Sequence, residues 1–403
     1  MGSANVYQLQ GEFEDSFCEE NAAPALKDIR AIGAKADLDE QVHVREENIQ
    51  RLTQYAGHVR GMRSGKLAFE HYLVGDGVEL DEGATPTDDP LQEMLTVCMG
   101  GSYSDEGSVT AGAPTTTVID VGAGEGIRFE PGQAVLFEDG GGSGIYEASI
   151  IESISTDTLT LAWALSNAPA AAKKVINGYC AYIDPSGTDT YQFSCIGDDN
   201  AHEWLLLGCW GGFKLSNLLQ VDSVAKLAFD WTATDWEQDT AALATASFEG
   251  ADPLPTNEQM EILFGNHGTS TRSRLSCSKL EIDPKVLEAH GAYHARGNLD
   301  HQGVDRVRMS KRINPTATIA PDASTAYLAA FNAATAKRLT VIIGNTPGQT
   351  IVIDLPKVYI NTLPKDGAAD DQLTTSINLI ADEDDAGDAS TAIMRSPIRI
   401  TRL

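Results

Sequence analysis

The sequence is short of cysteine, of basic residues and of long apolar runs. Its six cysteines lie far apart and form no Cys-x-x-Cys pair, so we expect no disulfide and no zinc site, but reduced core residues of a protein made in a cytoplasm. No apolar run is long enough to cross a bilayer, and the N-terminal stretch is too polar and acidic for a signal peptide. We therefore expect neither membrane insertion nor secretion.

Basic residues are outnumbered two to one, since 29 lysines and arginines stand against 58 aspartates and glutamates, with a formal net charge of -29. A nucleic-acid binder concentrates basic residues to displace counterions from phosphates. The balance therefore argues against an ordinary nucleic-acid binder. A solvated acidic surface that serves only solubility remains an alternative reading of the same charge.

One glycine-rich segment, Val118 to Gly126 ("VIDVGAGEG"), resembles the cofactor loop of an S-adenosylmethionine methyltransferase. That loop needs a helix directly after its glycines. The chain instead continues into Pro131-Gly132, which is turn chemistry, flanked by strand-like apolar residues. We expect Gly122, Gly124 and Gly126 to be turn residues and expect no cofactor, so a methyltransferase remains only a minor alternative.

The most enzyme-like detail is the histidine pair His290 and His294, which lie four residues apart. A metalloprotease helix would need a glutamate at position 291, where this chain has Gly291, so no metal-bound water is activated by the usual route. The acidic stretch 381–390 departs from the spacing of a calcium loop. Nucleophiles and carboxylates lack recognisable partners along the chain, so we expect no catalytic residue and no metal site.

Residues 104–180 read as a module of their own. Short β-rich runs such as "TTTVIDV", "QAVLF" and "DTLTLAWAL" alternate with glycine-rich or polar turns. This close, regular spacing is typical of a small all-β barrel. We expect an inserted barrel that decorates the outside of the protein and can be deleted.

Outside this module, the same order of expected strands and helices occurs twice along the chain. In the first half a basic-studded strand (58–75) precedes a short helix (89–100), which Asp89 caps with Pro90 in its first turn, and several strands follow. In the second half a basic-studded strand (305–322) again precedes a helix (323–336) and further strands. The order recurs without the inserted barrel, which indicates two related domains.

Several segments together resemble the tail tube (major tail) proteins of long-tailed bacteriophages. They are "LLLGCWGGFKLSNLLQVDSVAKLAFDWTATDW", which is similar to the central hairpin of that family, and "KLAFEHYLVGDGVELDEGATPTDDPLQEMLTVCMGG", which is similar to its loop and helix. The segments "RINPTATIAPD" and "GQTIVIDLPKVYIN" are similar to the closing part of larger members. The resemblance covers most of residues 40–403 and rests on diffuse patterns.

The resemblance implies a mainly β fold with flanking helices (α+β), in which β-sandwich domains form a ring or barrel on assembly. It implies a structural subunit, not an enzyme, that stacks in rings around a negatively charged channel for the genome. Its expected partners are further copies of itself, the tape measure protein and the tail terminator, with DNA passing without adhesion. Its expected location is the virion, after synthesis in the bacterial host cytoplasm. A distal tail or adaptor protein of the same fold is the main alternative.

The duplication adds a prediction about symmetry, because a chain with two such domains closes a six-fold ring with three subunits. The expected parts are an N-terminal arm (1–39), a first tail-tube domain (40–103 with 181–250), the inserted barrel (104–180) and a second tail-tube domain (251–403). Basic residues of the strands that begin each half are expected at subunit or ring contacts: Arg60, Arg63, Lys66, Arg306, Arg308, Lys311 and Arg312.

Overall fold

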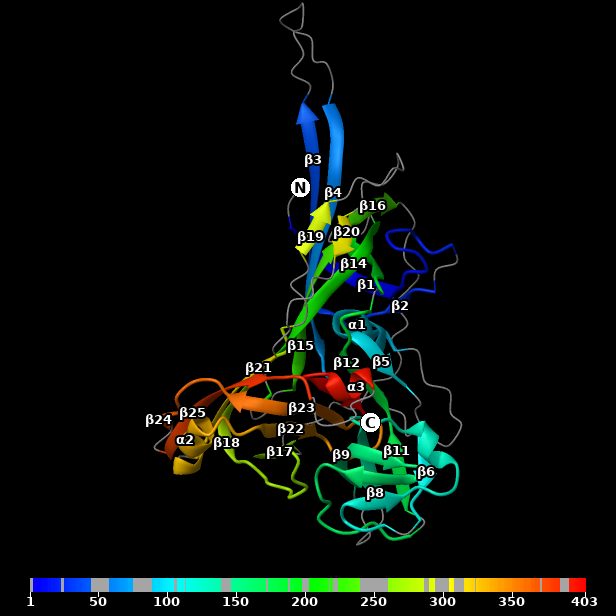
Figure 1. The fold of residues 1–403 in the computed structure, drawn as a ribbon. Coiled ribbons are helices and arrows are strands. Elements are labelled where there is room, and N and C mark those ends of the chain that lie inside the picture. The colour runs from blue at the N-terminus through cyan, green and yellow to red at the C-terminus, as the bar shows by residue number, and fades with distance from the viewer. Residues whose placement is uncertain are drawn as a thin grey trace, which may run out of the picture.

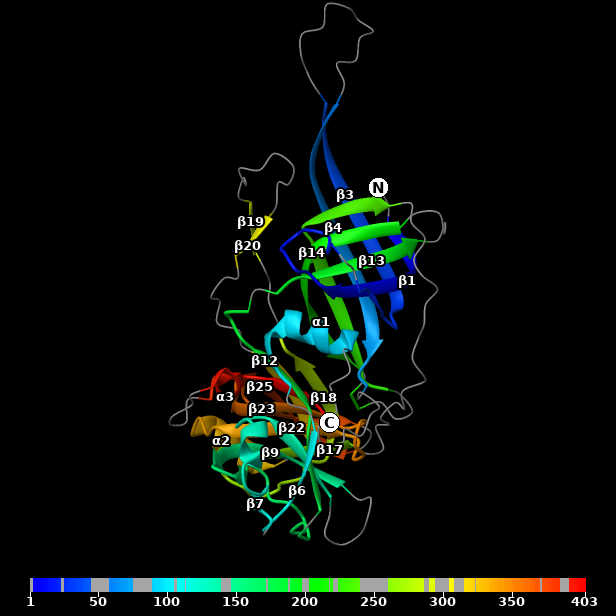
Figure 2. The same cartoon turned by 90° about the vertical axis from the view of Figure 1, so that its right-hand side faces the viewer.

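The structure is a computed structural model of the chain (Figures 1 and 2). It describes residues 3–22, 25–44, 58–74, 89–104, 107–112, 114–138, 146–171, 173–187, 189–197, 203–216, 218–219, 224–239, 260–285, 290–293, 304–307, 315–322, 324–369, 372–384 and 391–403. Strands predominate in these ranges, which confirms the β-rich fold class. No helix within them is long and apolar enough to span a membrane.

The first sheet closes on itself. Its strands are β1 (Ser3–Phe13), β3 (Ile32–Val44), β4 (His58–Tyr72), β13 (Tyr191–Gly197), β14 (Glu203–Ser216) and β15 (Lys226–Ala233). They pair in the order β13-β1-β3-β4-β15-β14, and β14 pairs again with β13. The short strands β2 (Lys27–Asp28) and β16 (Asp235–Asp239) pair with β1 and β14.

Alternation of apolar and polar residues produces this barrel-like sheet. In β15 the residues Leu227, Phe229 and Trp231 are buried, while their neighbours are at least partly exposed. Side chains alternate between the two faces of a strand, so such a pattern buries one face only. The buried face carries aromatic contacts, including Phe193 edge-on to Trp231 with ring centroids 5.1 Å apart.

Helix α1 (Pro90–Met99) lies where the sequence predicts it. The Asp89 side chain accepts a hydrogen bond of 2.8 Å from the amide of Leu91, and Pro90 occupies the first turn. The helix ends at Gly100, whose φ of 93° belongs to the left-handed region that glycine adopts readily. It packs against β1 and β14, together with two strands of the second sheet.

The second sheet contains β17 (Met260–Asn266), β18 (Cys277–Asp283), β21 (Thr316–Pro321), β22 (Lys337–Ile343), β23 (Ile351–Ile360) and β25 (Gln372–Ala381). It also includes β24 (Lys365–Ala369), β26 (Arg399–Arg402), β12 (Tyr179–Ile183) and β5 (Gly100–Tyr103). A separate pair, β19 (His290–Tyr293) with β20 (Val304–Val307), continues along the chain between β18 and β21. Near the C-terminus lies the short helix α3 (Ala392–Arg395).

The two sheets have matching pairing patterns. In chain order the first has β1, β3, β4, α1, β13, β14, β15 and β16, and the second has β17, β18, β21, α2, β22, β23, β25 and β26. Six strand pairs of the first sheet have a counterpart in the second. On one side of the match, β3–β4 corresponds to β18–β21, β4–β15 to β21–β25, and β15–β14 to β25–β23. On the other side, β14–β13 corresponds to β23–β22, β13–β1 to β22–β17, and β14–β16 to β23–β26. Helix α2 (Thr325–Asn332) packs on β23, as α1 packs on β14.

Two irregularities also recur at matching places. The register of β3 against β4 shifts between Ile32 and Lys35, and that of β18 against β21 shifts between Cys277 and Leu280. The register of β13 against β14 shifts between Tyr191 and Phe193, and that of β22 against β23 shifts between Lys337 and Leu339. Bulges re-aim strands and are conserved features of a fold. With Trp210 aligned to Tyr359, the bulges of β13/β14 and β22/β23 coincide residue for residue, and those of β3/β4 and β18/β21 lie one residue apart.

The expected module forms a sheet of its own. Its strands are β6 (Gly107–Thr110), β7 (Val118–Asp120), β8 (Ala134–Glu138), β9 (Tyr146–Ser155), β10 (Thr158–Leu161) and β11 (Lys174–Asn177). They pair in the order β6-β11-β8-β9-β10-β7 around an apolar cluster that includes Ile119, Phe137 and Leu159. All six strands lie within residues 104–180.

Two expected boundaries need correction. The stretch 1–39, expected to be an arm, contributes β1, β2 and most of β3, and its buried polar side chains find partners, as in the 2.5 Å hydrogen bond from Gln192 to Glu12. Of the strands that flank the module, β5 falls in the expected first domain, and β12 falls across the expected boundary at residue 180. They pair with each other, and β12 pairs with β26 of the second sheet.

Candidate assembly surface

The sheet around β3, β4, β15 and β14 has an outward face without core contacts. Directly opposed residues form rows across it, such as Asp37, Lys66 and Thr232, and Lys35, Ala68 and Asp230. The side chains at these positions are exposed or partly exposed. A sheet that buries one face and leaves the other polar presents a continuous hydrophilic wall.

Charge on this wall is balanced. The described charged side chains are Lys35, Lys66, Lys214, Lys226, Asp37, Asp39, Glu70 and Asp230. Lys226 forms a 2.9 Å ion pair with Glu70, and Lys66 stands opposite Asp37. These residues provide as many lysines as carboxylates, so they supply none of the negative surplus expected for the channel.

The corresponding face of the second sheet is polar with few charges. Thr318 donates a 3.0 Å hydrogen bond to Asn378, whose amide donates in turn to Thr362. The row Asp283, Thr316, Ile380 and Tyr359 takes the place of Asp37, Lys66, Thr232 and Trp210 in the first sheet. An aspartate and an aromatic residue thus occupy the same two places in both rows.

The predicted contact residues are only partly brought together. Arg60, Arg63 and Lys66 all lie on β4, and Arg306 lies on β20. Arg308, Lys311 and Arg312 lie outside the described residues. In the pairing pattern β4 matches β21, whereas β20 pairs with β19 in a separate two-stranded sheet, so the structure does not place Arg306 at a position equivalent to those on β4.

Arg63 already has partners within its own chain. Its guanidinium donates a 3.0 Å hydrogen bond to the carbonyl of Trp236, lies over that indole ring at 5.2 Å and approaches Glu40 at 3.8 Å. A partly buried arginine held by a carbonyl and a ring fixes the position of β16 beside β4. Lys66 is exposed on the outward polar face, in the row with Asp37 and Thr232.

The glycine segment forms a tight turn between β7 and β8. Gly122 and Gly124 have φ values of 90° and 86°, and only a single 3₁₀ turn (Glu125–Arg128) follows. A Cβ on Gly126 would lie 1.9 Å from the carbonyl oxygen of Thr156, so close backbone packing requires the glycine there. The structure confirms the turn expected from Pro131-Gly132.

The described residues of the histidine and acidic segments do not assemble into a recognisable metal centre. His290 lies on strand β19 opposite Val307, and His294 falls outside the described residues. In the acidic stretch, Asp384 is engaged by His267 at 3.4 Å. That hydrogen bond raises the pKa of His267 above its usual value despite partial burial. Within the ranges that the structure describes, no three His, Cys, Asp or Glu side chains are grouped to hold a metal ion.

The module is joined to the second sheet by a shared apolar core. The shared cluster contains Ala134, Leu136, Ala148, Ile150, Ala162, Trp163 and Ile176 of the module and Leu263, Ile342, Val352 and Leu403 of the second sheet and its end. The Trp163 side chain is fully buried, and its indole nitrogen donates a 2.9 Å hydrogen bond to Thr340. The expectation of a removable outer decoration is therefore wrong, because one face of the module is core.

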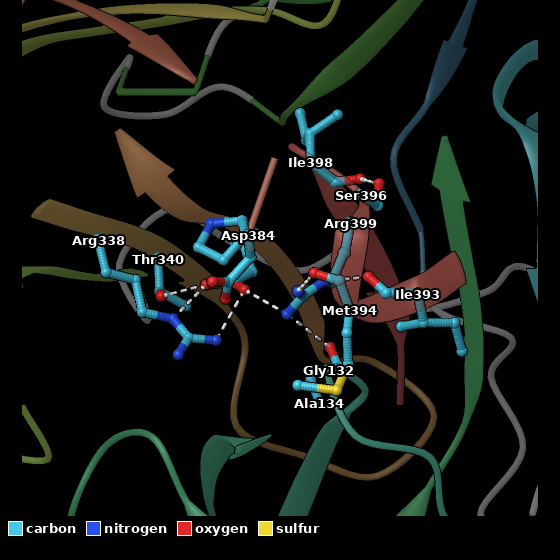
Figure 3. Close-up of polar contacts among 12 residues, drawn as sticks. Gly132, Ala134, Arg338, Thr340, Asp384, Ile393, Met394, Ser396, Ile398 and Arg399 are labelled. Carbon is cyan, nitrogen blue, oxygen red and sulfur yellow. Dashed lines mark hydrogen bonds and ion pairs between the residues drawn. The ribbon is translucent and has the colours of Figure 1, made fainter. Parts of the chain in front are cut away.

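A buried ion network reinforces this junction. Asp354 on β23 accepts from Arg338 at 2.9 and 3.0 Å and from Arg399 at 3.2 Å, and Thr340 donates to it at 2.7 Å. Arg338 also reaches Glu152 of the module at 2.8 Å, and Arg399 reaches the carbonyl of Gly132 at 3.4 Å. Figure 3 shows Arg338, Thr340 and Arg399 converging from β22 and β26.

The network holds two cations on one carboxylate in the interior. Arg338, Asp354 and Arg399 are each at most 4% exposed. Burial is the largest single effect on Arg338 and opposes its charge, but the interactions with Asp354 and Glu152 together outweigh it, so the pKa of Arg338 is raised. Burial dominates for Arg399, whose pKa is lowered although Asp354 opposes the shift. Such a group is strongly destabilised when one partner is removed, because an uncompensated charge stays buried.

Sequence reasoning missed this network, although one signal was present. Asp354 lies within the apolar run "IVIDL" between Ile353 and Leu355. A carboxylate inside a run that reads as a buried strand needs a buried cation. In comparisons with known proteins, no family model matched the chain and no curated protein matched it.

Proposed function

We propose that the chain is the repeating subunit of a phage tail tube. The observation that carries the proposal is the recurrence of one pairing pattern, with its helix and its two bulges, in both sheets. Two tube domains in one chain close a six-fold arrangement with three chains, and head-to-tail contacts that do not close stack the rings into a filament. The role is structural, with no catalysis.

The outward polar faces suit the wall of the channel. Long sheets with unpaired edges associate promiscuously unless neighbours cover them, and a closed ring covers them. On the described face Lys226 forms an ion pair with Glu70, and Lys66 stands opposite Asp37. Non-adhesive passage of DNA would therefore rest on this pairing, which leaves few cations for phosphates.

The proposal also covers the location of the subunit and the proteins beside it. It places the protein in the virion, between a tape measure protein inside the tube and a terminator at its end. A distal tail or adaptor protein would occupy a single ring, whereas a tube subunit polymerises. Negative-stain microscopy of the purified chain tests this: stacked rings with a central channel support the proposal, and dispersed single chains contradict it.

A charge reversal tests the channel wall. The Asp230→Lys variant places an additional cation on the wall, so assembled tubes should bind DNA. Each phosphate contacted should steepen the fall of log affinity with log salt by roughly 0.9. The matched control is Glu237→Lys, which makes the same charge change at an exposed position on β16. Equal DNA binding by both variants in filter-binding or anisotropy assays would exclude this face from the channel.

A further inference from the structure

We infer that the contact between the two sheets inside one chain is repeated between chains, so that the far edge of the second sheet binds β3 of another copy. This inference rests on the proposed function. Three observations carry it: the internal contact, an uncovered matching edge on the second sheet, and an uncovered matching edge on the first.

The internal contact joins β14 of the first sheet to β18 of the second. Residues 211–216 of β14 pair with β15 and with no other described strand. β18 pairs with β21 alone among the described strands. One apolar core runs through both sheets and includes Phe213 and Leu215 on the first side and Leu280 and Ile282 on the second.

The strand that matches β14 in the second sheet is β23. The strand registers align Trp210 with Tyr359, because Trp210 ends the row through Lys66 and Thr232 and Tyr359 ends the matching row through Thr316 and Ile380. Residues 359–363 therefore match 210–214. On one side these residues hydrogen-bond to β25, ending with the 2.8 Å bond from the amide of Asn361 to the carbonyl of Asn378. On the other side, β22 pairs with β23 only as far as Val358.

An exposed leucine marks this uncovered edge. Leu363 is 53% exposed and lies in the connection between β23, which ends at Ile360, and β24, at the place that Lys214 takes when residues are counted on from Tyr359 and Trp210. Large apolar side chains at such exposure on an unpaired sheet edge favour association. The segment lies at the outer end of the second sheet beside β24 and β25, away from the first sheet (Figure 1).

The strand that matches β18 in the first sheet is β3. Its matching bulge lies between Ile32 and Lys35, and β1 covers β3 only from Lys35 to Asp37. Gly33 in that bulge is exposed, and no atom lies within 4 Å of the position a Cβ would occupy. The edge of β3 is therefore open at residues 31–34, whereas β1 covers residues 35–37 through a pairing that β17 and β18 do not make.

The occupant of each edge is a second copy of this chain, because the complementary edge exists on the chain itself. The contact is heterologous, since residues 359–363 of one copy meet residues 31–34 of the next. Heterologous contacts close into rings when the rotation permits. One internal and one external contact for each chain would alternate around a ring of three chains.

A cross-linking experiment tests the inference. The double variant Lys35→Cys/Leu363→Cys, treated with a short bis-maleimide after assembly, should give linked dimers and trimers on a denaturing gel and no larger species. The control Lys214→Cys/Glu281→Cys places thiols at the matching internal positions and should link within single chains. Unmodified protein and each single variant report any reaction of the natural cysteines.

The outcomes separate the inference from the proposed function. Tubes that are visible by microscopy but give no linked copies overturn the inferred contact and leave the tube role standing. Single chains without links overturn both, and a ladder reaching six overturns the three-chain ring. As a second measurement, Leu363→Glu should weaken association about tenfold or more, while Leu328→Glu, on the 44% exposed leucine of α2, should not.

Discussion

Replacing residues 104–178 by a short glycine-serine linker is expected to give an insoluble chain. The deletion uncovers Leu263, Ile342, Val352 and Leu403, which the module now buries. Fully covering one such side chain contributes about 1.5–3 kcal/mol, so the loss is comparable with a whole free energy of unfolding of about 5–15 kcal/mol. Solubility after expression and cooperative denaturant unfolding measure the result.

Two point variants of Trp163 measure how much its packing contributes to stability without removing any of the chain. Trp163→Ala should lower the free energy of unfolding by about 3–5 kcal/mol, as expected for a buried aromatic residue. Trp163→Phe keeps an apolar ring and loses mainly the hydrogen bond to Thr340, which costs about 1 kcal/mol. A soluble deletion variant that unfolds cooperatively would show that the junction is dispensable.

Asp354→Asn is expected to lower the free energy of unfolding by about 3–5 kcal/mol, because it removes one partner from a buried ion pair. The amide leaves the charges of Arg338 and Arg399 without their common buried carboxylate. Urea unfolding of the full chain, followed by tryptophan fluorescence, measures the change. Leaving two cations in the interior should also loosen the module from the second sheet.

The matched control is Glu152→Gln, which removes the other carboxylate of Arg338. The Glu152 side chain is 34% exposed, so water replaces part of the lost interaction. Its effect should stay near the 0–1 kcal/mol of surface pairs. Equal effects of Asp354→Asn and Glu152→Gln would show that burial of the network contributes little.

Local patterns along the chain predicted local structure well. Asp89 followed by Pro90 indicated the start of α1, and alternation indicated strands such as β15. The turn at Pro131-Gly132 also followed from the chemistry of these residues, since proline and glycine restrict or permit specific backbone angles. These features depend on near neighbours in the sequence.

Features that depend on distant partners were missed. β1 carries Gln8, Gln10 and Glu12, which read as a solvated arm because their partners, such as Gln192, lie far along the chain. The pairing of β12 with β5 on one side and with β26 on the other is likewise set by tertiary structure. The module junction depends on Trp163 and Asp354 meeting β22 and β26, which no periodicity reveals.

The most direct test of the account is image reconstruction of the assembled particle by electron cryomicroscopy. The account predicts three chains in each ring, six similar domains around a channel, and β4 and β21 at matching places about the pseudo-six-fold axis. Six identical chains in each ring, or β4 and β21 in unrelated positions, would contradict it.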